Sequence, residues 1–307
     1  MSAETVRSGV LVVDKPAGMT SFDVVGIVRR RLGVPRVGHA GTLDPDATGV
    51  LPILLGEATK LMAYLAEHDK EYRALVRFGV RTDTQDLSGR VLSTVAVTGL
   101  NHETVSDAAS AFVGRIRQTP PMYSAVHHGG RRLYELAREG VEVERASREV
   151  MVHSIDVEDV HDATATLRIV CGKGTYVRTL AADLGDALGF GAAVERLMRL
   201  RVGPFTLTGA VPWPELEAGS AATLNARVAP PEAALAAWTA VNLDVARADA
   251  FRHGQPVECL EACVGLVRVH DAVGGLIGVG AVEAGGRGLR PIRILHADRS
   301  DARVLPA

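Results

Sequence analysis

Strand-like and helix-like segments follow one another along this chain without a regular βαβ period, and that order limits its possible folds. Residues 10–13 (VLVV) form an apolar run that Pro16 and Gly18 end, which predicts a strand. Residues 70–78 (KEYRALVRF) alternate apolar and polar side chains, as a half-buried strand requires. Residues 148–189 predict two more strands and then a helix that begins near Thr175. The mixed order favours an α+β domain with a substantially antiparallel sheet.

The segment TSFDVVGIVRRRLG, residues 20–33, carries the signals of a helix. Thr20 and Asp23 have capping-box spacing, and apolar residues recur at helical intervals until Gly33 ends the pattern. Three consecutive arginines would lie in the last turn, where the helix dipole favours cations. Their presence therefore has a structural explanation that requires no ligand. A further helix is predicted in residues 104–114 (TVSDAASAFVG).

The composition changes in the last third of the chain. Residues 209–238 are rich in alanine and proline, which predicts a peripheral or connecting segment. Beyond them, short β-rich runs are separated by glycine turns. That pattern predicts a small β-barrel-like module at the C-terminal end.

Size and composition are those of an ordinary globular protein. The chain has 307 residues, of which 47% are hydrophobic and 23% charged, enough for one large domain and a small one. No apolar segment approaches the roughly 18 residues that a membrane span needs, and the N-terminal apolar run is too short for a signal peptide. We therefore expect a cytoplasmic protein. Three cysteines favour reduced thiols over a disulfide framework, and Cys259, Cys263 and His270 lack the second pair of a zinc site.

The net charge of −2 does not by itself indicate a nucleic-acid-binding protein. Arginines nevertheless cluster in three places: Arg29, Arg30, Arg31 and Arg36; Arg196, Arg199 and Arg201; and Arg287, Arg290, Arg293 and Arg299. Local patches of this kind can bind phosphate even when the whole protein is acidic. Charge alone favours the simpler interpretation that they are solvated faces.

The most unusual stretch is GHAGTLDPDATG, residues 38–49, which leads into an apolar segment. A calcium loop is excluded, because Leu55 occupies the position where a bidentate glutamate is required. Pro45 biases Asp44 towards an extended conformation, and the glycines allow the backbone to approach a ligand closely. A carboxylate held this way suits nucleophilic catalysis, although Asp-Pro is also a common turn. The spacing leaves both interpretations open.

Nucleotide-binding loops receive no support. Leu167 lies where the first glycine of a GxxxxGK[ST] loop would precede Gly172 and Lys173, and no GxGxxG follows a strand.

Several segments together resemble the TruB family of bacterial tRNA pseudouridine-55 synthases. In order, they are DKPAGMTS, GHAGTLDPDATGVLPILLGEATK, DKEYRALVRFGVRTDTQDLSG, TPPMYSAVHHGGRRLYELAREG, CGKGTYVRTLAADLG and RVGPF. They cover most of residues 9–205, and the combination of the second with the fifth is highly specific. The C-terminal residues resemble the family's PUA-type RNA-binding module more loosely.

The resemblance implies a pseudouridine synthase fold and an isomerase that needs no cofactor and no metal. It implies a catalytic domain over residues 1–240, with a thumb-like segment at about 120–150, and a PUA-like module over residues 241–307. The expected substrate is the T-arm stem-loop of tRNA, without an obligatory protein partner or membrane, and the protein is expected to be a monomer. The alternative is a tRNA-binding folding helper in which catalysis is secondary. A guide-RNA-dependent relative is disfavoured by the bacterial type of residues 120–140.

The resemblance also assigns the catalytic residues. Asp44 corresponds to the family's essential aspartate, which would attack uracil C6 or ribose C1′ or assist a glycal intermediate. Arg178 corresponds to the arginine paired with it, and a guanidinium there would keep the carboxylate ionised and oriented. Tyr72 corresponds to the tyrosine that stacks on the base and helps to remove a proton.

The remaining assignments concern binding of the RNA. His39 corresponds to the residue that fills the stack after the target base is flipped out. Flipping the base costs a few kcal/mol. Tyr176 corresponds to the family's second active-site tyrosine, and Leu197 corresponds to an apolar residue that packs near the uracil. Arg131 and Arg132 are expected to contact phosphates. Two positions depart from the family pattern. Asp46 adds a negative charge close to Asp44, and Met198 stands where relatives often have arginine.

Overall fold

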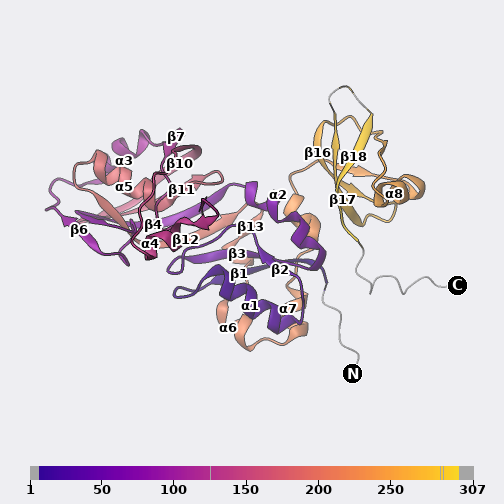
Figure 1. Ribbon diagram of the computed structural model, residues 1–307, viewed down its shortest axis with the longest axis horizontal. Coiled ribbons are helices and arrows are strands. Elements are labelled where there is room, and N and C mark those ends of the chain that lie inside the picture. Colours follow the sequence, from indigo (N-terminus) through magenta and orange to yellow (C-terminus); the bar gives the residue numbers. More distant parts are fainter. Residues whose placement is uncertain (1–6, 125, 284, 286, 297–307) are drawn as a thin grey trace. The chain divides into compact units, whose positions relative to one another are not determined.

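The computed structural model describes residues 7–124, 126–283, 285 and 287–296 of the chain (Figure 1). Arg299, in the last arginine cluster, lies outside these residues. The described residues form two compact units. The first unit contains residues up to 45, residues 50–66 and residues from 203 onward; the second contains residues 46–49 and 67–202. Each unit is described by itself. Within the described residues, every helix is too short or too polar to span a membrane.

The first unit begins with the predicted strand and helix. Strand β1 (Gly9–Lys15) is followed by helix α1 (Ser21–Leu32). Thr20 caps this helix by accepting a hydrogen bond from the Asp23 N–H, while the Asp23 carboxylate accepts one from the Thr20 N–H. Gly33 ends the helix with a φ of 65°. The capping box and the glycine stop that the sequence predicts are therefore confirmed.

The apolar segment after the unusual loop is a buried strand. Strand β3 (Thr48–Leu55) neighbours β1 and pairs with the short antiparallel strand β2 (Val37–His39). Its first two residues belong to the second unit. The 3-10 helix η1 (Gly56–Leu61) and helix α2 (Met62–Glu67) follow.

Residues 209–238 contain more structure than the predicted connecting segment. They form helices α6 (Trp213–Ala218) and α7 (Ala221–Ala226) and the 3-10 helix η3 (Pro231–Leu235). Leu216, Leu224 and Leu235 are completely buried. Backbone bridges join Val211 and Ala229 to β1. The segment is therefore part of the core of the first unit, and the prediction of a merely connecting role is wrong.

The C-terminal part of the first unit is β-rich, as predicted. Its five-stranded sheet has the order β14 (Ala240–Asn242), β16 (Gly265–His270), β17 (Leu276–Val282), β18 (Gly288–Ile294), β15 (Val257–Glu258). Helix α8 (Val245–Arg252), which the sequence did not predict, contributes Phe251 to a separate hydrophobic core with Val267, Val269 and Leu289. The division of the chain into domains at residue 240 stays a prediction.

The second unit is built on an antiparallel sheet. Its strands have the order β12 (Ala192–Val202), β4 (Lys70–Phe78), β11 (Thr164–Cys171), β10 (Arg148–His161), β7 (Gly114–Gln118). All four pairings between these strands are antiparallel, whereas residues 48–49 and Asp86 pair in parallel with β12. The predicted α+β fold with a mixed, largely antiparallel sheet is confirmed.

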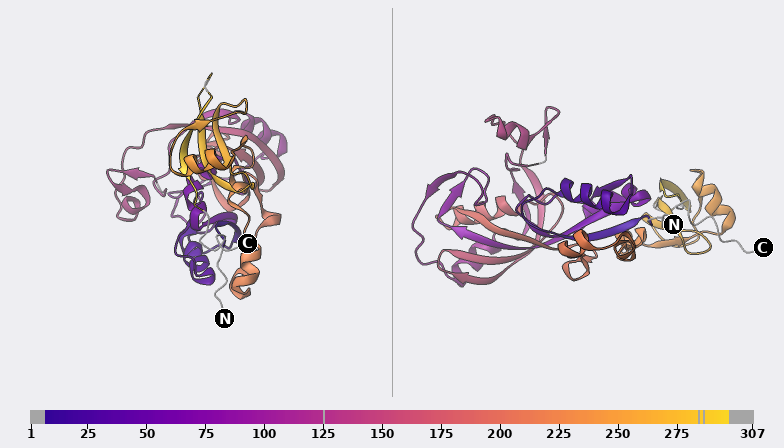
Figure 2. Two further views of the ribbon diagram at one scale, coloured as in Figure 1. Left: turned by 90° about the vertical axis from the view of Figure 1, so that its right-hand side faces the viewer. Right: turned by 90° about the horizontal axis from the view of Figure 1, so that it is seen from below.

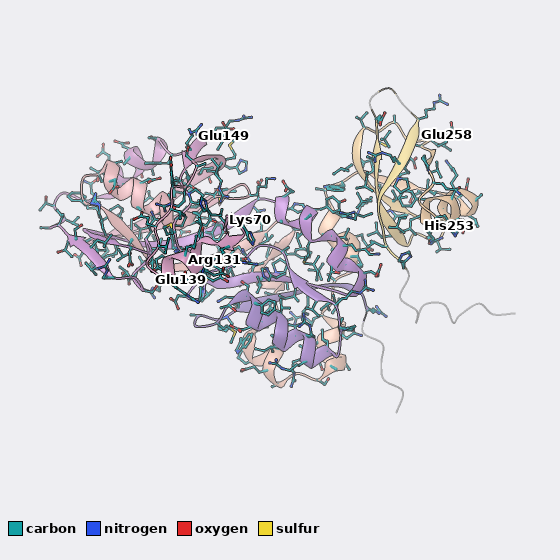
Figure 3. All side chains as sticks on the ribbon, in the orientation of Figure 1. Lys70, Arg131, Glu139, Glu149, His253 and Glu258 are labelled. Carbon is teal, nitrogen blue, oxygen red and sulfur yellow. The ribbon has the colours of Figure 1, made fainter. Side chains whose placement is uncertain are left out.

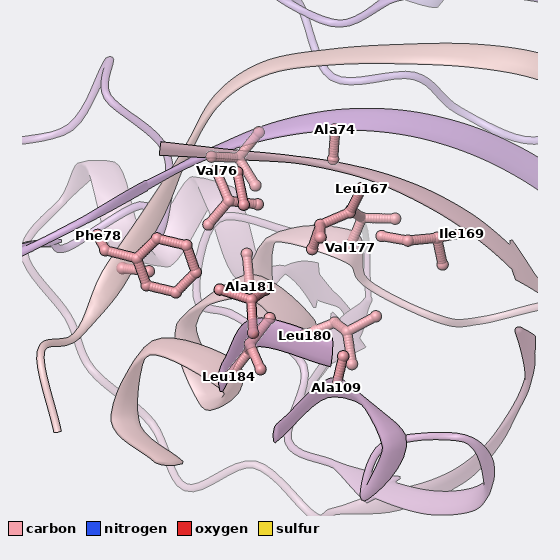
Figure 4. Packing of buried hydrophobic residues seen from close by; sticks show 14 of the residues in the cluster. Ala74, Val76, Phe78, Ala109, Leu167, Ile169, Val177, Leu180, Ala181 and Leu184 are labelled. Atoms are coloured by element: carbon pink, nitrogen blue, oxygen red, sulfur yellow. The ribbon is translucent and has the colours of Figure 1, made fainter. Parts of the chain in front are cut away.

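Two helices cover one face of this sheet. Helix α5 (Val177–Ala187) and helix α3 (His102–Ser110) pack on the alternating apolar residues of the strands. Figure 4 shows Leu180 and Leu184 of α5 facing Val76 and Phe78 of β4. Burial of these side chains contributes roughly 1.5–3 kcal/mol each. The packing determines where the beginning of α5 lies over the sheet.

The second unit also carries two excursions from its sheet. The short strands β5 (Val80–Thr82) and β6 (Val91–Thr94) pair with each other. Residues 119–147, here called the thumb segment, leave the sheet after β7 and return at β10. The segment contains the hairpin of β8 (His127–His128) and β9 (Arg131–Arg132) and helix α4 (Leu133–Arg138). Figure 2 shows it projecting from the second unit, and Met122, Leu133 and Leu136 form its own small core.

Candidate active site

The backbone on both sides of Asp44 is held by hydrogen bonds. Before it, the Leu43 N–H donates to Ser21 Oγ at 2.9 Å, and Ser21 Oγ donates to the Leu43 carbonyl oxygen at 3.2 Å. After it, the Pro45 carbonyl oxygen accepts from the Gly18 N–H at 3.0 Å and from Lys15 Nζ at 2.8 Å. Asp44 itself is half-buried. Its carboxylate therefore starts from a backbone whose position is well defined.

Lys15 is the last residue of β1 and is completely buried. Its ammonium group also donates to the Pro16 carbonyl oxygen at 2.7 Å. A buried ammonium is costly unless its donors are satisfied, and these two carbonyl groups contribute to that. The motif DKPAG therefore holds the loop that follows Asp44, which is a role that its sequence did not reveal.

The glycines of this loop allow close approach, but to the protein itself. A Cβ atom at Gly38 would lie 2.5 Å from Met62 Sδ. A Cβ atom at Gly49, whose φ is +99°, would lie 2.2 Å from the Arg199 carbonyl oxygen. The sequence predicted close approach to a ligand, whereas packing within each unit already explains both residues.

His39 and Asp46 lie on either side of Asp44 in the sequence. His39 is half-buried at the end of β2, where it pairs with Ile53 of β3. Asp46 is exposed. The position of His39 at the start of the loop permits the predicted role in filling the RNA stack, which stays a prediction.

Arg178 is buried at the beginning of α5, with 5% of its surface exposed. Its guanidinium donates to the carbonyl oxygens of Thr84 and Tyr123, both at 2.8 Å. It also lies 3.4 Å from Asp86 Oδ2. The planar fork of an arginine can satisfy acceptors in several directions at once, which an ammonium cannot do. Arg178 is therefore a fixed cation, not the surface arginine that its sequence position on a helix would also allow.

Tyr176 is the residue immediately before α5 and is half-buried. Its N–H donates to Gln118 Oε1 at 3.0 Å, and its carbonyl oxygen accepts from Gln118 Nε2 at 3.2 Å. The guanidinium carbon of Arg148 lies 4.9 Å from the centre of its ring. Sequence reasoning missed Gln118, Arg148 and Asp86, because nothing local marks them as neighbours of the GTYVR segment.

Tyr72 and Leu197 lie on the face of the sheet that α5 covers. Leu197 of β12 is opposite Ala74 of β4, and Tyr72 is two residues from Ala74 on the same strand. Because side chains alternate along a strand, all three point to the same face. Tyr72 and Leu197 are half-buried at the margin of the core. Core packing is therefore part of the role of each.

Two cationic residues share this face with Tyr72. Arg199 is opposite Tyr72 in β12 and is 1% exposed, and Lys70 of β4 is 7% exposed. Burial, with a smaller contribution from the charge of Arg199, lowers the pKa of Lys70 to about 8. Two buried cationic side chains therefore lie beside Tyr72.

The two arginines of the thumb segment are exposed, and their expected contacts with phosphates stay a prediction. Arg131 already forms a bidentate ion pair with Glu139, at 3.0 and 2.5 Å (Figure 3). A phosphate would therefore compete with that carboxylate for Arg131. Met198 is 37% exposed and lies opposite Arg73, on the other face of the sheet from Leu197.

The predicted site residues thus fall into two groups. His39 and Asp44 belong to the first unit, and the others belong to the second: Tyr72, Arg131, Arg132, Tyr176, Arg178 and Leu197. Within the second unit, Tyr176 and Arg178 share the beginning of α5, above the face that carries Tyr72 and Leu197. Among the described residues, no three His, Cys, Asp or Glu side chains are grouped in a way that could hold a metal ion.

Comparison with known proteins agrees with the motifs and covers most of the chain. Residues 29–177 match the model of the TruB family pseudouridylate synthase N-terminal domain. Residues 178–236 match the tRNA pseudouridylate synthase B C-terminal domain, and residues 239–295 match the C-terminal domain of pseudouridine synthase II TruB.

Individual relatives carry the name tRNA pseudouridine synthase B. The chain is 47% identical over 278 residues to tRNA pseudouridine synthase B of Dechloromonas aromatica, covering 91% of this chain and 92% of the relative. It is 49% identical over 249 residues to the protein of the same name from Symbiobacterium thermophilum, covering 80% and 82%. Among solved structures, one titled "Crystal Structure of a Cbf5-Nop10-Gar1 Complex" matches with a TM-score of 0.75 at 24% identity, covering 97% of this chain and 88% of that one. That match supports the fold alone.

Proposed function

The chain belongs to the TruB family of pseudouridylate synthases, and we propose that it is a tRNA pseudouridine(55) synthase that isomerises the T-loop uridine of tRNA. The observation that carries the proposal is the similarity to tRNA pseudouridine synthase B, which extends over nine-tenths of both chains. The motifs that carry the similarity include the loop of Asp44 and the beginning of α5. A tRNA-folding helper without essential catalysis is not favoured by the names of these relatives.

The reaction conserves atoms and electrons. The bond between ribose C1′ and uracil N1 breaks, a bond between C1′ and C5 forms, C5 loses a proton and N1 gains one. An ionised carboxylate can initiate this rearrangement, and we assign that role to Asp44. The anchoring of Leu43 and Pro45 supports the assignment, because a weak nucleophile depends on accurate positioning.

We assign the supporting catalytic roles to Arg178 and Tyr72. Arg178 is a buried guanidinium held by two carbonyl groups, which suits it to orient and stabilise an anionic partner. Tyr72 presents a half-buried ring beside two buried cations, which suits it to stack on a uracil and to accept the C5 proton as those cations stabilise negative charge.

The target base must leave the folded RNA before it can react. We propose that His39 fills the vacated stack, that Tyr176 and Leu197 pack against the uracil, and that Arg131 and Arg132 contact the backbone. Folded RNA is recognised mainly through shape, phosphates and unstacked bases, which this mixture of aromatic, apolar and cationic groups can read.

We further propose that the chain acts on tRNA alone, as a cytoplasmic monomer without a guide RNA, a protein partner or a cofactor. The test uses the purified chain with an unmodified tRNA transcript and with an isolated T-arm stem-loop, and maps pseudouridine by carbodiimide modification and primer extension. The proposal predicts one pseudouridine, at the T-loop uridine, in both RNAs. The absence of pseudouridine from the full transcript would overturn the function. Product in the transcript but not in the stem-loop would overturn only the claim that the T-arm suffices.

A further inference from the structure

The ring and the backbone of Tyr176 are held by the two residues between which the thumb segment leaves the sheet. The segment begins after Gln118, the last residue of β7, and ends before Arg148, the first residue of β10. These two residues are directly opposite each other in the antiparallel pairing of the strands. Both contact Tyr176, which is far from each of them in the sequence.

Gln118 fixes the backbone. It is 1% exposed, and its side-chain amide exchanges two hydrogen bonds with the N–H and the carbonyl oxygen of Tyr176. A buried amide that satisfies both groups of one residue restricts the rotation of that residue's backbone. The direction in which Tyr176 enters α5 is therefore set by the end of β7.

Arg148 fixes the ring. Its guanidinium lies over the ring, and its Nη2 donates to the Gly174 carbonyl oxygen at 2.5 Å. Its Nε is buried and has no hydrogen-bond partner among the described residues. An unpaired buried donor is unfavourable, so Nε contributes nothing that would hold this side chain in place. The stack on Tyr176 and the bond to Gly174 are the interactions that place it.

The base of the thumb segment is tied together at the same point. The Arg117 guanidinium donates to Ser147 Oγ at 3.1 and 2.6 Å, and Arg145 Nη1 donates to the Pro120 carbonyl oxygen at 3.1 Å. Farther along the segment, the Tyr123 carbonyl oxygen accepts from Arg178. The position of the segment is therefore linked to the beginning of α5 through more than one contact.

We infer that Arg148 is a positioning residue for the proposed reaction: it holds the ring of Tyr176 in its working orientation and links that orientation to the base of the thumb segment. The inference rests on the proposed function, since the orientation of Tyr176 affects turnover only if this ring lies against the uracil. Arg148 acts through Tyr176 and is not assigned a contact with the RNA.

The first test is steady-state kinetics of the full chain on the T-arm stem-loop. Arg148→Met removes the cation and the bond to Gly174, and lowers kcat about tenfold while KM stays within about threefold. Arg148→Lys keeps the charge but loses the flat guanidinium, so it restores only part of the rate. Arg115→Met is the matched control. Arg115 lies on the neighbouring strand in an exposed ion pair with Glu149, and its loss leaves kcat within about twofold.

A double-mutant cycle separates positioning from a general structural effect. Tyr176→Leu removes the ring, and in that background Arg148→Met lowers kcat by less than about twofold. An equal loss in both backgrounds would overturn the inference. So would an increase in KM with unchanged kcat, because that result would make Arg148 a residue that binds the RNA.

A second measurement does not depend on activity. The chain contains five tyrosines, so fluorotyrosine labelling gives few ¹⁹F resonances, and Tyr176→Phe identifies the one of interest. The inference predicts that Arg148→Met shifts this resonance and that Arg115→Met does not. An unshifted resonance would overturn the inference even if the wild-type chain makes pseudouridine. If Arg148→Met shifts the resonance but the wild-type chain forms no pseudouridine, the contact is established and the proposed function is rejected.

Discussion

The hydroxyl group of Ser21 makes two hydrogen bonds with the backbone of Leu43, one as acceptor at 2.9 Å and one as donor at 3.2 Å. Ser21 is the first residue of α1 and is 1% exposed, and Leu43 directly precedes Asp44. The beginning of a helix thereby holds a loop that lies 22 residues away in the sequence. Because the side chain of Asp44 can be no better placed than its backbone, these bonds connect a structural serine to the role proposed for Asp44.

Replacing Ser21 by alanine removes both bonds and leaves two buried backbone groups of Leu43 unpaired. We expect a loss of about 1–3 kcal/mol in the free energy of unfolding. We also expect kcat to fall, because Asp44 loses its support on one side. Urea unfolding and single-turnover rates measure the two effects. Ser110→Ala, at an exposed helix end, is the control and changes neither by much. Unchanged turnover in Ser21→Ala would show that this anchor does not position Asp44.

Arg178→Lys tests the need for a planar cation at the beginning of α5. An ammonium cannot bond at once to the carbonyl groups of Thr84 and Tyr123. If Arg178 stabilises the charge of the reacting groups, turnover falls by about 100-fold or more. Arg73→Lys, in an exposed ion pair with Glu158, leaves turnover nearly unchanged. Wild-type turnover in Arg178→Lys would contradict the role proposed for the guanidinium.

Alanine substitutions at two glycines with almost the same φ separate the cost of backbone strain from the cost of a steric clash. Gly49 has a φ of +99° and Gly114 a φ of +101°, but only Gly49 faces a nearby atom, the Arg199 carbonyl oxygen. Both alanine variants lose about 1 kcal/mol or more through the left-handed conformation. Gly49→Ala must also displace a strand, so its loss is larger. Thermal unfolding of the two variants side by side measures the difference, and equal losses would mean that the close approach at Gly49 costs nothing.

Glu57 predicts a dependence of stability on pH. Burial alone would raise the pKa of its carboxyl group, but hydrogen bonds from Lys60 and the His296 N–H, with the charges of Lys60 and Arg36, lower it below 4.5. A carboxyl group whose pKa is lowered by folding stabilises the fold at any pH above its pKa in the unfolded state. This stabilisation is lost as the pH falls through its pKa in the folded state. Glu57→Gln therefore lowers the free energy of unfolding at pH 7. Below about pH 4.5, the free energy of unfolding of this variant falls less steeply with pH than that of the wild type. Glu149→Gln is the exposed control, and parallel curves for Glu57→Gln and the wild type would contradict the prediction.

Local signals were sufficient to predict much of the fold. The capping box of Thr20 and Asp23 and the stop at Gly33 are read within a few residues, and the structure confirms them. The strand around Tyr72 was predicted from the alternation of apolar and polar side chains alone, and β4 forms there. What the sequence did not reveal depends on distant packing. Residues 209–238 show no strong period, yet Leu216 is completely buried because these residues pack against β1.

The site shows the same limit. Asp44, Tyr176 and Arg178 were identified by motifs that resemble a family, since spacing alone left a common turn as an equal interpretation. The partners that place them were not identified. Gln118 lies 58 residues from Tyr176, and neither a period nor a motif joins the two. Contacts of this kind become visible only when the sheet brings β7 beside the beginning of α5.

The most direct test of the central claim compares Asp44→Asn with the wild-type chain in two assays on the same tRNA transcript, pseudouridine formation and tRNA binding. Asparagine preserves the shape of the side chain but cannot supply an ionised carboxylate. We predict that the wild-type chain converts the T-loop uridine, and that the variant binds tRNA with an affinity within about threefold but forms no pseudouridine. Pseudouridine formation by Asp44→Asn at a rate near that of the wild type would contradict the account.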